Sequence, residues 1–445
     1  MTPPPAIPAI PAFPASPGVP TSATSATSAT GTPAGHRIAH VEAIALRVAR
    51  PLTSHMGHPL QPSERGYLID PDNGTIYPAD DRTLLLRVTC EDGTVGWGET
   101  YGIVAAGAVQ ALVEDVIAPF LRGQDPLDVQ LLWQRLYDMM RVRGYTTGFW
   151  LDALAAVDIA LWDLCGKRLG LPVRKLLGGG ARDRLPAYIT HIPGTDPAAK
   201  LEAVGALRAE GYRAFKVHAS SAFDPVALIH AMRAHFPDIE IMLDLHWHHT
   251  AGEAINIARA IESCRIAFLE APVHTEDIDG LARLAAVTRI PIAVGEEWRT
   301  VFDAHLRLKT GALSVIQPEM GRTGITQFLR ICQLADVFHV RVAPHATIGF
   351  GVFMAASLHA SAAAAMFSVH EVQNHFVHRY LDHFDTTMRC EDGRYTLPEG
   401  PGLGIAPKAS LMRYVVDPRG GAASAASGTS AASGLSASRD LPPGA

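Results

Sequence analysis

The fold is decided between residues 213 and 297, where four apolar runs follow one another: RAFKVH (213–218), IEIMLDLH (239–246), IAFLEAP (266–272) and IPIAVGEE (290–297). Similar runs flank this stretch: LPAYITH (185–191), LSVIQPE (313–319), VRVAPH (340–345) and MFSVHE (366–371). Continuous apolar runs of this length are typical of parallel strands that are buried on both faces. Because a segment with helical spacing follows each run, the sequence predicts eight βα-like units and a parallel sheet.

The polar residues at the ends of these runs recur with a nearly constant spacing of 28, 26, 26, 23, 26 and 26 residues. They are Lys216, Asp244, Glu270, Glu296, Glu319, His345 and Glu371. This spacing is the length of one βα repeat, and eight such repeats close into a barrel. In barrels of this kind the active site lies at the carboxyl ends of the strands. We therefore expect these side chains to converge on one mouth.

A separate α+β domain is predicted before the barrel. Apolar and polar residues alternate from 37 to 50, and RTLLLRVTCEDGTVGWGE (82–99) reads as two strands joined by the Asp92-Gly93 turn. Helical spacing follows near 105–121, 127–141 and 147–169. Residues 54–81 fit neither period, so we expect a long loop there that acts as a lid.

Composition sets the outer limits of the folded part. Residues 1–36 contain no Lys, Arg, Asp or Glu, and residues 418–445 are dominated by Gly, Ala and Ser, so both are predicted to be disordered tails. Between them we predict the N-terminal domain at 38–160, the barrel at 161–390 and a segment at 391–415 that returns to the N-terminal domain. Prolines throughout the first tail argue against a secretory signal.

Charge and cysteine content exclude several classes of protein. The net charge of the 445 residues is −6 and no basic run is present, which argues against a nucleic-acid partner. The five cysteines are scattered without a CxxC pair, so a disulfide framework and a cysteine zinc site are not predicted, and a reducing, cytoplasmic compartment fits. The weakly polar stretch 350–369 fits a buried helix better than a membrane span.

Three carboxylates end successive strands: Asp244, Glu270 and Glu296. A single acidic residue in such a place often caps the following helix, but three at the same depth favour a metal site. Ligation by oxygen alone favours Mg²⁺ or Mn²⁺ over zinc. The sequence therefore predicts a magnesium site at the mouth of the barrel.

Histidines at the strand ends are candidates for acid and base catalysis. Lys216 and His218 are two residues apart, as are Asp244 and His246, so both members of each pair should face the same side of their strand. His246 could supply the general acid that a leaving hydroxyl group needs. We interpret the neighbouring His248 and His249 as structural.

A second acid–base candidate involves Glu319 and His345, which end neighbouring strands. A carboxylate beside an imidazole fixes its tautomer and raises its basicity, which suits a general base near neutral pH. Glu371 on the eighth strand is predicted either as a protonated acid that donates to a substrate oxygen or as a structural carboxylate.

These residues and motifs resemble the enolase superfamily, in particular the mandelate racemase subgroup that includes the acid-sugar dehydratases. The resemblance spans about 38–415. It is carried by the strand-end residues already named and by ALAAVDIALWDLCGKRLGLPVRKLLGG (153–179), IQPEMGRTGIT (316–326), APHATIGFG (343–351) and HEVQ (370–373).

The resemblance implies a capping domain over a modified (β/α)₇β barrel, one essential Mg²⁺, and removal of the proton α to a carboxylate to give an enediolate. With DLH at 244–246 the site is most similar to that of galactonate-type dehydratases, which implies His345 as base, Glu319 as its orienting partner and His246 as acid. Lys216 and a protonated Glu371 would help to stabilise the developing negative charge. The expected product is a 2-keto-3-deoxy acid.

The same resemblance implies how specificity arises and how the chain assembles. The cap closes over the barrel in this family, so we expect the loop containing His55, His58 and Tyr67 and the turn from Glu99 to Gly102 to read the substrate. A homo-oligomer is also implied.

Alternatives remain open at this point. His218 stands where many relatives carry a second Lys that acts as the base for the other face, so a racemase, an epimerase or a lactone cycloisomerase could use the same enediolate. The His246-x-His248 pair is found in zinc amidohydrolases, although there it lies on the first strand. A non-catalytic protein that binds sugar acids is a further alternative.

Overall fold

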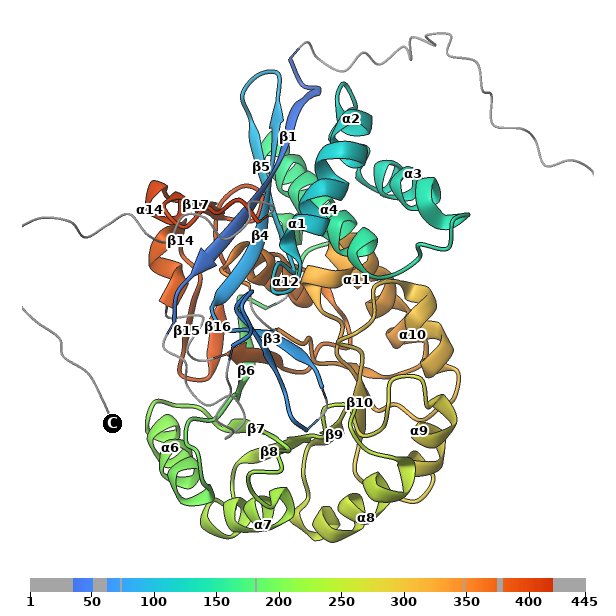
Figure 1. Ribbon diagram of the computed structural model, residues 1–445, viewed down its shortest axis with the longest axis vertical. Coiled ribbons are helices and arrows are strands. Elements are labelled where there is room, and N and C mark those ends of the chain that lie inside the picture. The colour runs from blue at the N-terminus through green and yellow to red at the C-terminus, as the bar shows by residue number, and fades with distance from the viewer. Residues whose placement is uncertain are drawn as a thin grey trace, which may run out of the picture. The chain divides into compact units, whose positions relative to one another are not determined.

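The computed structural model describes residues 35–50, 62–72, 74–180, 182–346, 349–373 and 379–418, which lie within one compact unit. The two predicted tails fall outside these ranges except for residues 35, 36 and 418. In Figure 1 the described chain runs from the blue strands of an N-terminal cap to the green, yellow and orange elements of a barrel.

The barrel contains the eight predicted strands, all parallel to their neighbours in the ring. They are β6 (Arg184–Thr190), β7 (Ala214–His218), β8 (Glu240–Asp244), β9 (Phe268–Glu270), β10 (Ile292–Val294), β11 (Val315–Ile316), β12 (Arg341–Val342) and β13 (His370–Gln373). Strand β13 pairs with β6 in register His370 to Ala187, and a bridge joins Val342 to Phe367, so the sheet is closed.

One helix lies between each pair of consecutive barrel strands, which gives the expected (β/α)₇β order. The helices are α6 (Pro197–Ala209), α7 (Pro225–His235), α8 (Ala251–Ile261), α9 (Ile278–Ala285), α10 (Val301–Leu308), α11 (Met320–Val337) and α12 (Val352–Ala363). Figure 1 shows α6 to α10 on the outer side of the strands. Helix α12 is buried along nearly its whole length, as predicted for the weakly polar stretch.

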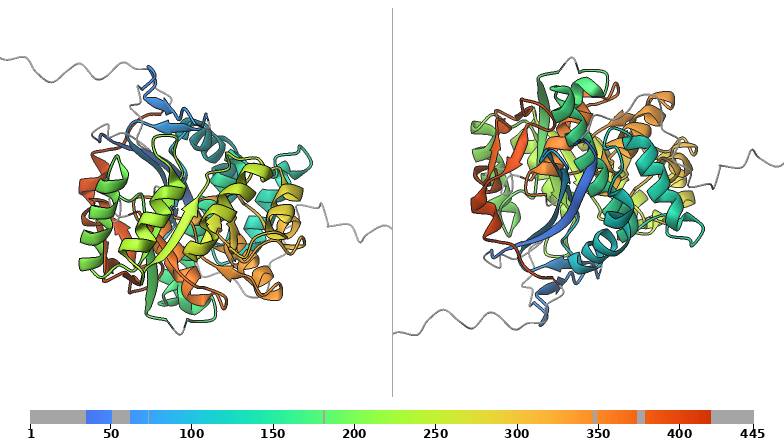
Figure 2. Two further views of the ribbon diagram at one scale, coloured as in Figure 1. Left: turned by 90° about the horizontal axis from the view of Figure 1, so that it is seen from below. Right: turned by 90° about the horizontal axis from the view of Figure 1, so that it is seen from above.

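The cap combines a three-stranded antiparallel sheet with helices. Its strands are β1 (Ile38–Val48), β4 (Asp81–Cys90) and β5 (Val95–Thr100), and the β4–β5 turn contains Asp92 and Gly93, of which Gly93 has a positive φ of 84°. The helices are α1 (Ala106–Leu112), α2 (Ala118–Leu121), α3 (Val129–Arg141) and α4 (Phe149–Leu169), with a π-helical turn, Val113–Ile117, between α1 and α2. Figure 2 shows the blue cap strands beside these teal helices.

Helix α4 lies between the two domains and packs against both. Because apolar residues occur all around it, the helix is buried on every side. Strand β5 lies directly against it: a Cβ added to Gly98 would be 1.9 Å from the carbonyl oxygen of Ala156. On the barrel side, Asp158 accepts a hydrogen bond of 2.8 Å from the backbone N–H of Thr326 in α11. The expected domain boundary at residue 160 therefore falls inside a continuous helix.

A second link between cap and barrel is the carboxylate of Glu99, which is fully buried. It accepts hydrogen bonds from the backbone N–H groups of Phe350 (2.6 Å), Gly351 (3.2 Å) and Phe353 (2.9 Å) at the start of α12. Helix N-termini carry unpaired N–H groups and favour negative charge. Burial raises the pKa of Glu99, and these hydrogen bonds oppose the rise.

The predicted lid region differs from a plain loop. Strands β2 (Tyr67–Ile69) and β3 (Ile76–Pro78) form an antiparallel hairpin within it, and residues 51–61 lie outside the described ranges. The hairpin was missed because its strands have three residues each, too few to show an alternating pattern.

The C-terminal elements are short. They include a 3₁₀ turn (Leu381–His383), β14 (Phe384–Thr386), β15 (Arg389–Glu391), β16 (Arg394–Thr396), β17 (Ile405–Pro407) and α14 (Ala409–Met412). Strand β16 pairs antiparallel with β6 of the barrel and with β15, and the end of the segment returns to the cap strand β1. The backbone N–H of Arg47 in β1 donates to Tyr414 (3.0 Å), and that of Val416 donates to Ala45 (3.0 Å).

The five cysteines are buried and free, as their scattered positions predicted. Among the described residues, no helix combines the length and the apolar character that crossing a membrane requires.

We expect Gly98→Ala to destabilise the protein because its new methyl group would meet the backbone of α4, which cannot move aside. Overpacking of this kind costs roughly 1–3 kcal/mol, which would lower the urea midpoint of unfolding. The matched control is Gly252→Ala in α8, where the methyl group meets open space. There the midpoint should be unchanged or rise slightly, since alanine is favoured over glycine in a helix by about 0.5–1 kcal/mol. An unchanged midpoint for Gly98→Ala would contradict this account of the cap.

Candidate active site

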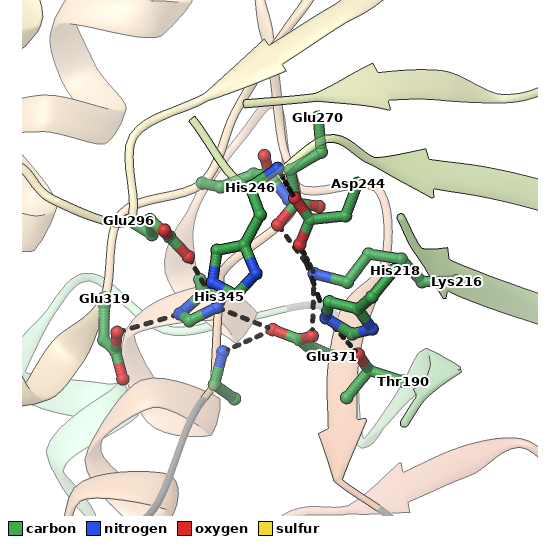
Figure 3. A network of polar contacts seen from close by, with 12 residues as sticks. Thr190, Lys216, His218, Asp244, His246, Glu270, Glu296, Glu319, His345 and Glu371 are labelled. Atoms are coloured by element: carbon green, nitrogen blue, oxygen red, sulfur yellow. Dashed lines mark hydrogen bonds and ion pairs between the residues drawn. The ribbon is translucent and has the colours of Figure 1, made fainter. Parts of the chain in front are cut away.

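The ammonium group of Lys216 lies at the centre of the polar residues that end the barrel strands. Its side chain is 0% exposed, and Nζ lies 2.6 Å from Oε1 of Glu270, 2.9 Å from Oε1 of Glu371 and 3.6 Å from Oδ2 of Asp244. These contacts are visible as dashed lines in Figure 3. A buried charge requires partners of opposite sign, and here three strands supply them.

The ionisation behaviour of this cluster follows from burial and from its surplus of carboxylates. Burial by itself lowers the pKa of Lys216, but Glu270 and Glu371 outweigh it, so the pKa lies well above its usual value. Burial raises the pKa of Glu270 to about 8; Lys216 opposes the rise, whereas Asp244 and Glu371 add to it. Lys216 alone therefore does not balance the negative charge around Glu270.

His345 joins two carboxylates, one through each ring nitrogen. Its Nδ1 lies 2.8 Å from Oε2 of Glu319, and the two residues also form a parallel backbone bridge. Its Nε2 lies 2.8 Å from Oε2 of Glu296 and 3.6 Å from Oε2 of Glu371. Sequence analysis predicted the partner Glu319; the contact with Glu296 was not predicted, because it depends on side-chain directions at the mouth.

Burial by itself lowers the pKa of His345, but Glu371, Glu296 and Glu319 outweigh it, and its pKa lies well above its usual value. Burial raises the pKa of Glu296, whereas His345 lowers it more, so that its pKa lies well below the usual range. The two directions describe an ion pair between an imidazolium and a carboxylate.

His218 and His246 lie on another side of the same cluster. His218 is the last residue of β7, and its Nε2 lies 3.4 Å from Oδ2 of Asp244 and 3.5 Å from the hydroxyl of Thr190. The ring centroids of His218 and His246 are 6.0 Å apart. The predicted site residues thus come together at one mouth (Figure 3).

His246 reaches the mouth by a route that differs from the prediction. Strand β8 ends at Asp244, so His246 does not share a strand face with it. Instead, His246 and Trp247 have positive φ angles of 54° and 59°, and the N–H of His246 donates to Oδ1 of Asp244 (2.8 Å). Left-handed conformations are unfavourable for residues other than glycine, and sequence patterns do not reveal them.

One group of described residues has the geometry to hold a metal ion. Glu270, Glu296 and His345 each offer one ligand atom, and these atoms lie within 4.8 Å of one another. The group differs from the predicted trio in one member, because Asp244 is hydrogen-bonded to the turn that follows it. The buried carboxylates, together with the raised pKa of Glu270, fit a divalent cation that prefers oxygen ligands.

Several residues of the site were missed by sequence reasoning. The Tyr101 hydroxyl donates to Oε2 of Glu319, and the Arg322 guanidinium lies 4.2 Å from the centre of the Tyr101 ring. Trp247 donates from Nε1 to Oε1 of Glu296 (2.7 Å), and the Gln317 amide donates to Oε2 of Glu270 (2.6 Å). Gln317 could have been found, since it precedes Glu319 by two residues at the same strand end.

The residues expected to read the substrate lie in different places. Glu99 is buried under α12 and does not line the mouth, whereas Tyr101 of the same turn reaches Glu319. The Tyr67 hydroxyl accepts a hydrogen bond from the N–H of Ala105 at the base of the hairpin. His55 and His58 lie outside the described residues.

Comparison with known proteins agrees with this architecture. Residues 77–178 match the family model described as mandelate racemase / muconate lactonizing enzyme, N-terminal domain, and residues 198–411 match the model described as enolase C-terminal domain-like. The chain is 35% identical over 350 residues to a D-galactonate dehydratase of Ralstonia nicotianae, covering 74% of this chain and 90% of the relative.

Two further relatives carry different names. A D-galactarolactone cycloisomerase of Agrobacterium fabrum is 33% identical over 341 residues, covering 72% of this chain and 88% of the relative. The crystal structure of a Sinorhizobium meliloti protein, provisionally described as an isomerase and in an open loop conformation, superposes with a TM-score of 0.82 at 46% identity, covering 85% and 99% of the two chains.

The N-terminal family model matches the cap, and the C-terminal family model matches the barrel that follows it. The strand-end carboxylates, Lys216 and the histidines lie together at the mouth of the barrel (Figure 3). This protein is therefore an enzyme of the enolase superfamily and belongs to its mandelate racemase/muconate lactonizing enzyme family.

Proposed function

We propose that this protein is a Mg²⁺-dependent dehydratase of acid sugars, which removes the α-proton and the β-hydroxyl group of an aldonate or aldarate. The observation that supports this proposal most is the pair of imidazoles at one mouth: His345, bound to Glu319, and His246, which ends the DLH motif. The D-galactonate dehydratase name of a relative that covers most of the chain points the same way.

His345 is the proposed base. As a base it acts in its neutral form, with Glu296 bound to the metal ion instead of to Nε2. Nε2 then takes the proton from the carbon next to the substrate carboxylate, and the electrons of that C–H bond form the enediolate. Glu319 holds Nδ1 at 2.8 Å, which fixes the ring and stabilises the imidazolium that results. Lys216 is buried and positively charged, so it is suited to stabilise the second negative charge of the enediolate.

His246 is the proposed acid. When the enediolate collapses, the bond to the β-hydroxyl group breaks, and a proton from His246 converts the leaving group to water. The resulting enol then tautomerises to the 2-keto-3-deoxy acid. A base and an acid on separate strands allow both proton transfers in one site, and each contributes typically 10²–10⁴-fold to the rate.

Asp244, Glu270 and Glu296 are the proposed ligands of the metal ion. Their oxygen donors fit Mg²⁺ better than zinc. When bound, the ion supplies a Lewis acid that favours ionisation of the carbon acid. Glu371 lies between Lys216 and His345. Its Oε1 forms an ion pair with Lys216, and its Oε2 accepts a hydrogen bond from the N–H of Ala346. We propose that Glu371, when protonated, donates a hydrogen bond to a substrate oxygen.

Replacement of the base should abolish dehydration. We expect His345→Asn to lower the rate of 2-keto acid formation from the best substrate of an aldonate and aldarate panel by about 10²–10⁴-fold, because asparagine cannot take the proton. The matched control is His248→Asn, which changes an exposed histidine of the β8–α8 loop and should leave the rate unchanged. Full turnover by His345→Asn would disprove the mechanism.

A metal titration distinguishes the two possible ligand sets. Mg²⁺ added to chelator-treated protein should raise its melting temperature, since a ligand that binds the folded state stabilises it. If the three carboxylates bind the ion, Asp244→Asn should lose most of this shift and His345→Asn should keep it. The opposite pattern would assign His345 as the third ligand, and a shift with Zn²⁺ but not Mg²⁺ would contradict the proposed metal.

An isomerase is the second candidate function. His218 lies beside Asp244, on the strand of Lys216, and could act as a base for the other face of the substrate. The cycloisomerase name of one relative and the isomerase description of a similar structure support this alternative.

The sugar-acid panel in deuterated water separates the two functions. A dehydratase should form chelator-sensitive 2-keto acid from one or two substrates. An isomerase should instead yield a product of inverted configuration or a rearranged lactone that carries deuterium at the α-carbon, with no keto acid. In that case His218→Asn should abolish formation of the inverted product but preserve exchange at the face served by His345.

A further inference from the structure

The β2–β3 hairpin of the cap contacts the barrel through polar side chains at two places. At its turn, Asp72 accepts a hydrogen bond of 2.9 Å from the backbone N–H of Ser221, in the loop after β7, and a second bond from the Ser221 hydroxyl. On β3, the Tyr77 hydroxyl lies 2.9 Å from Nε2 of His246. Figure 1 shows the hairpin extending from the cap toward the barrel strands.

The base of the hairpin is fastened to the cap. The guanidinium of Arg82 lies 4.6 Å from the centre of the Tyr67 ring and donates to the carbonyl oxygen of Gly66 (3.1 Å). The Tyr67 hydroxyl accepts from the N–H of Ala105 (3.1 Å). The hairpin is thus anchored at its base, where Tyr77 lies one residue from the Tyr67–Pro78 pair, and its turn contacts the barrel through Asp72.

Leu68 of the hairpin is buried, but the pair of isoleucines beside it is not. Ile69 and Ile76, which are paired across its two strands, are 62% and 45% exposed. A two-stranded hairpin is at best marginally stable by itself. Its position over the barrel therefore depends on the polar contacts of Asp72 and Tyr77. A hairpin with only a structural role would be expected to pack against the barrel through apolar side chains.

The contact with Tyr77 determines which nitrogen of His246 is available for chemistry. Nε2 is occupied by the Tyr77 hydroxyl, whereas Nδ1 is buried and has no hydrogen-bond partner among the described residues. Figure 3 shows the His246 ring pointing into the cluster of polar side chains. The backbone contacts of His246 do not fix its imidazole ring, which can rotate about its χ angles. The hydrogen bond with the Tyr77 hydroxyl group fixes the direction of the ring.

We propose that Tyr77 is a positioning residue for the elimination step: it orients His246 so that Nδ1 delivers the proton to the departing hydroxyl group. The Nδ1–H bond breaks, the proton joins the leaving oxygen to form water, and Nε2 stays bound to the Tyr77 oxygen. This inference rests on the proposed dehydratase function. The barrel alone would then not form the complete site, because the hairpin of the cap must also contact His246 through Tyr77.

The proposal separates the two halves of the reaction. Removal of the α-proton by His345 depends on Glu319 and on residues of the barrel, none of which touches the hairpin in the described contacts. Loss of the hydroxyl group depends on His246 and thus on Tyr77. An enzyme whose hairpin is not seated should therefore exchange the α-hydrogen with solvent without forming product.

The experiment compares Tyr77→Phe with the full-length wild-type protein in Mg²⁺ and deuterated water, using the best substrate of the sugar-acid panel. We expect 2-keto acid formation to fall about 10–100-fold, a part of the general-acid contribution. The ratio of deuterium incorporated into recovered substrate to 2-keto acid formed should rise by at least the same factor. KM should change little, because the phenyl ring remains.

The matched control is Tyr145→Phe, which removes the hydroxyl group of an exposed tyrosine between α3 and α4 and should leave the ratio of exchange to product unchanged. A second readout does not depend on turnover: amide hydrogen exchange of residues 67–78. Ser221→Ala should speed this exchange by loosening the turn of the hairpin. If Tyr77 only held the hairpin in place, Tyr77→Phe would speed this amide exchange as Ser221→Ala does and would raise the ratio of exchange to product no more than Ser221→Ala.

Two failures can be told apart. If the wild-type protein forms keto acid and Tyr77→Phe keeps its rate and its ratio, the inference about Tyr77 is wrong and the dehydratase proposal stands. If the wild-type protein exchanges the α-hydrogen and forms no keto acid from any substrate, the dehydratase proposal is wrong and the inference fails with it. Because Tyr77→Phe keeps the aromatic ring and removes only the hydroxyl group, the variant should keep a melting temperature close to that of the wild type, which shows that the comparison is between folded proteins.

Discussion

The ammonium group of Lys216 has no contact with solvent and is surrounded by carboxylates from β8, β9 and β13. Removing a charge from water is costly, and only close partners of opposite sign repay that cost. The partners must therefore approach from several strands at the same height, which a closed parallel barrel provides. Three carboxylates surround this one ammonium group, an arrangement that suits a site for a divalent cation. Burial raises the pKa of Glu270 to about 8, and the neighbouring carboxylates of Asp244 and Glu371 add to the rise.

The cap is held over this mouth by two buried connections. Helix α4 packs against the cap strand β5 at glycine positions and against α11 of the barrel through Asp158. The carboxylate of Glu99 accepts the N–H groups at the start of α12. Both connections are more buried than the Ile69 and Ile76 side chains of the β2–β3 hairpin, which contacts the barrel through Asp72 and Tyr77. These connections fix the part of the cap to which the base of the hairpin is anchored.

The residues that carry the proposed chemistry are placed by irregular backbone just beyond the strands. Glu296, Glu319 and His345 follow strands that end two or three residues earlier, and His246 lies in a turn with positive φ. Such positions let a side chain point across the mouth, whereas a residue within a strand must face the interior or the outer helices. The regular strands provide the frame, and the turns direct the side chains.

The sequence by itself determined the barrel, the β1–β4–β5 sheet and the convergence of the strand-end residues, because continuous apolar runs at a fixed spacing report burial and topology directly. It also identified the pair of His345 and Glu319, since neighbouring parallel strands bring their carboxyl ends together. Only the tertiary structure decided the contacts of His345 with Glu296, of Tyr101 with Glu319 and of Tyr77 with His246. These contacts join the cap to the barrel or depend on the direction of a side chain after a strand has ended, and neither property leaves a periodic trace in the sequence.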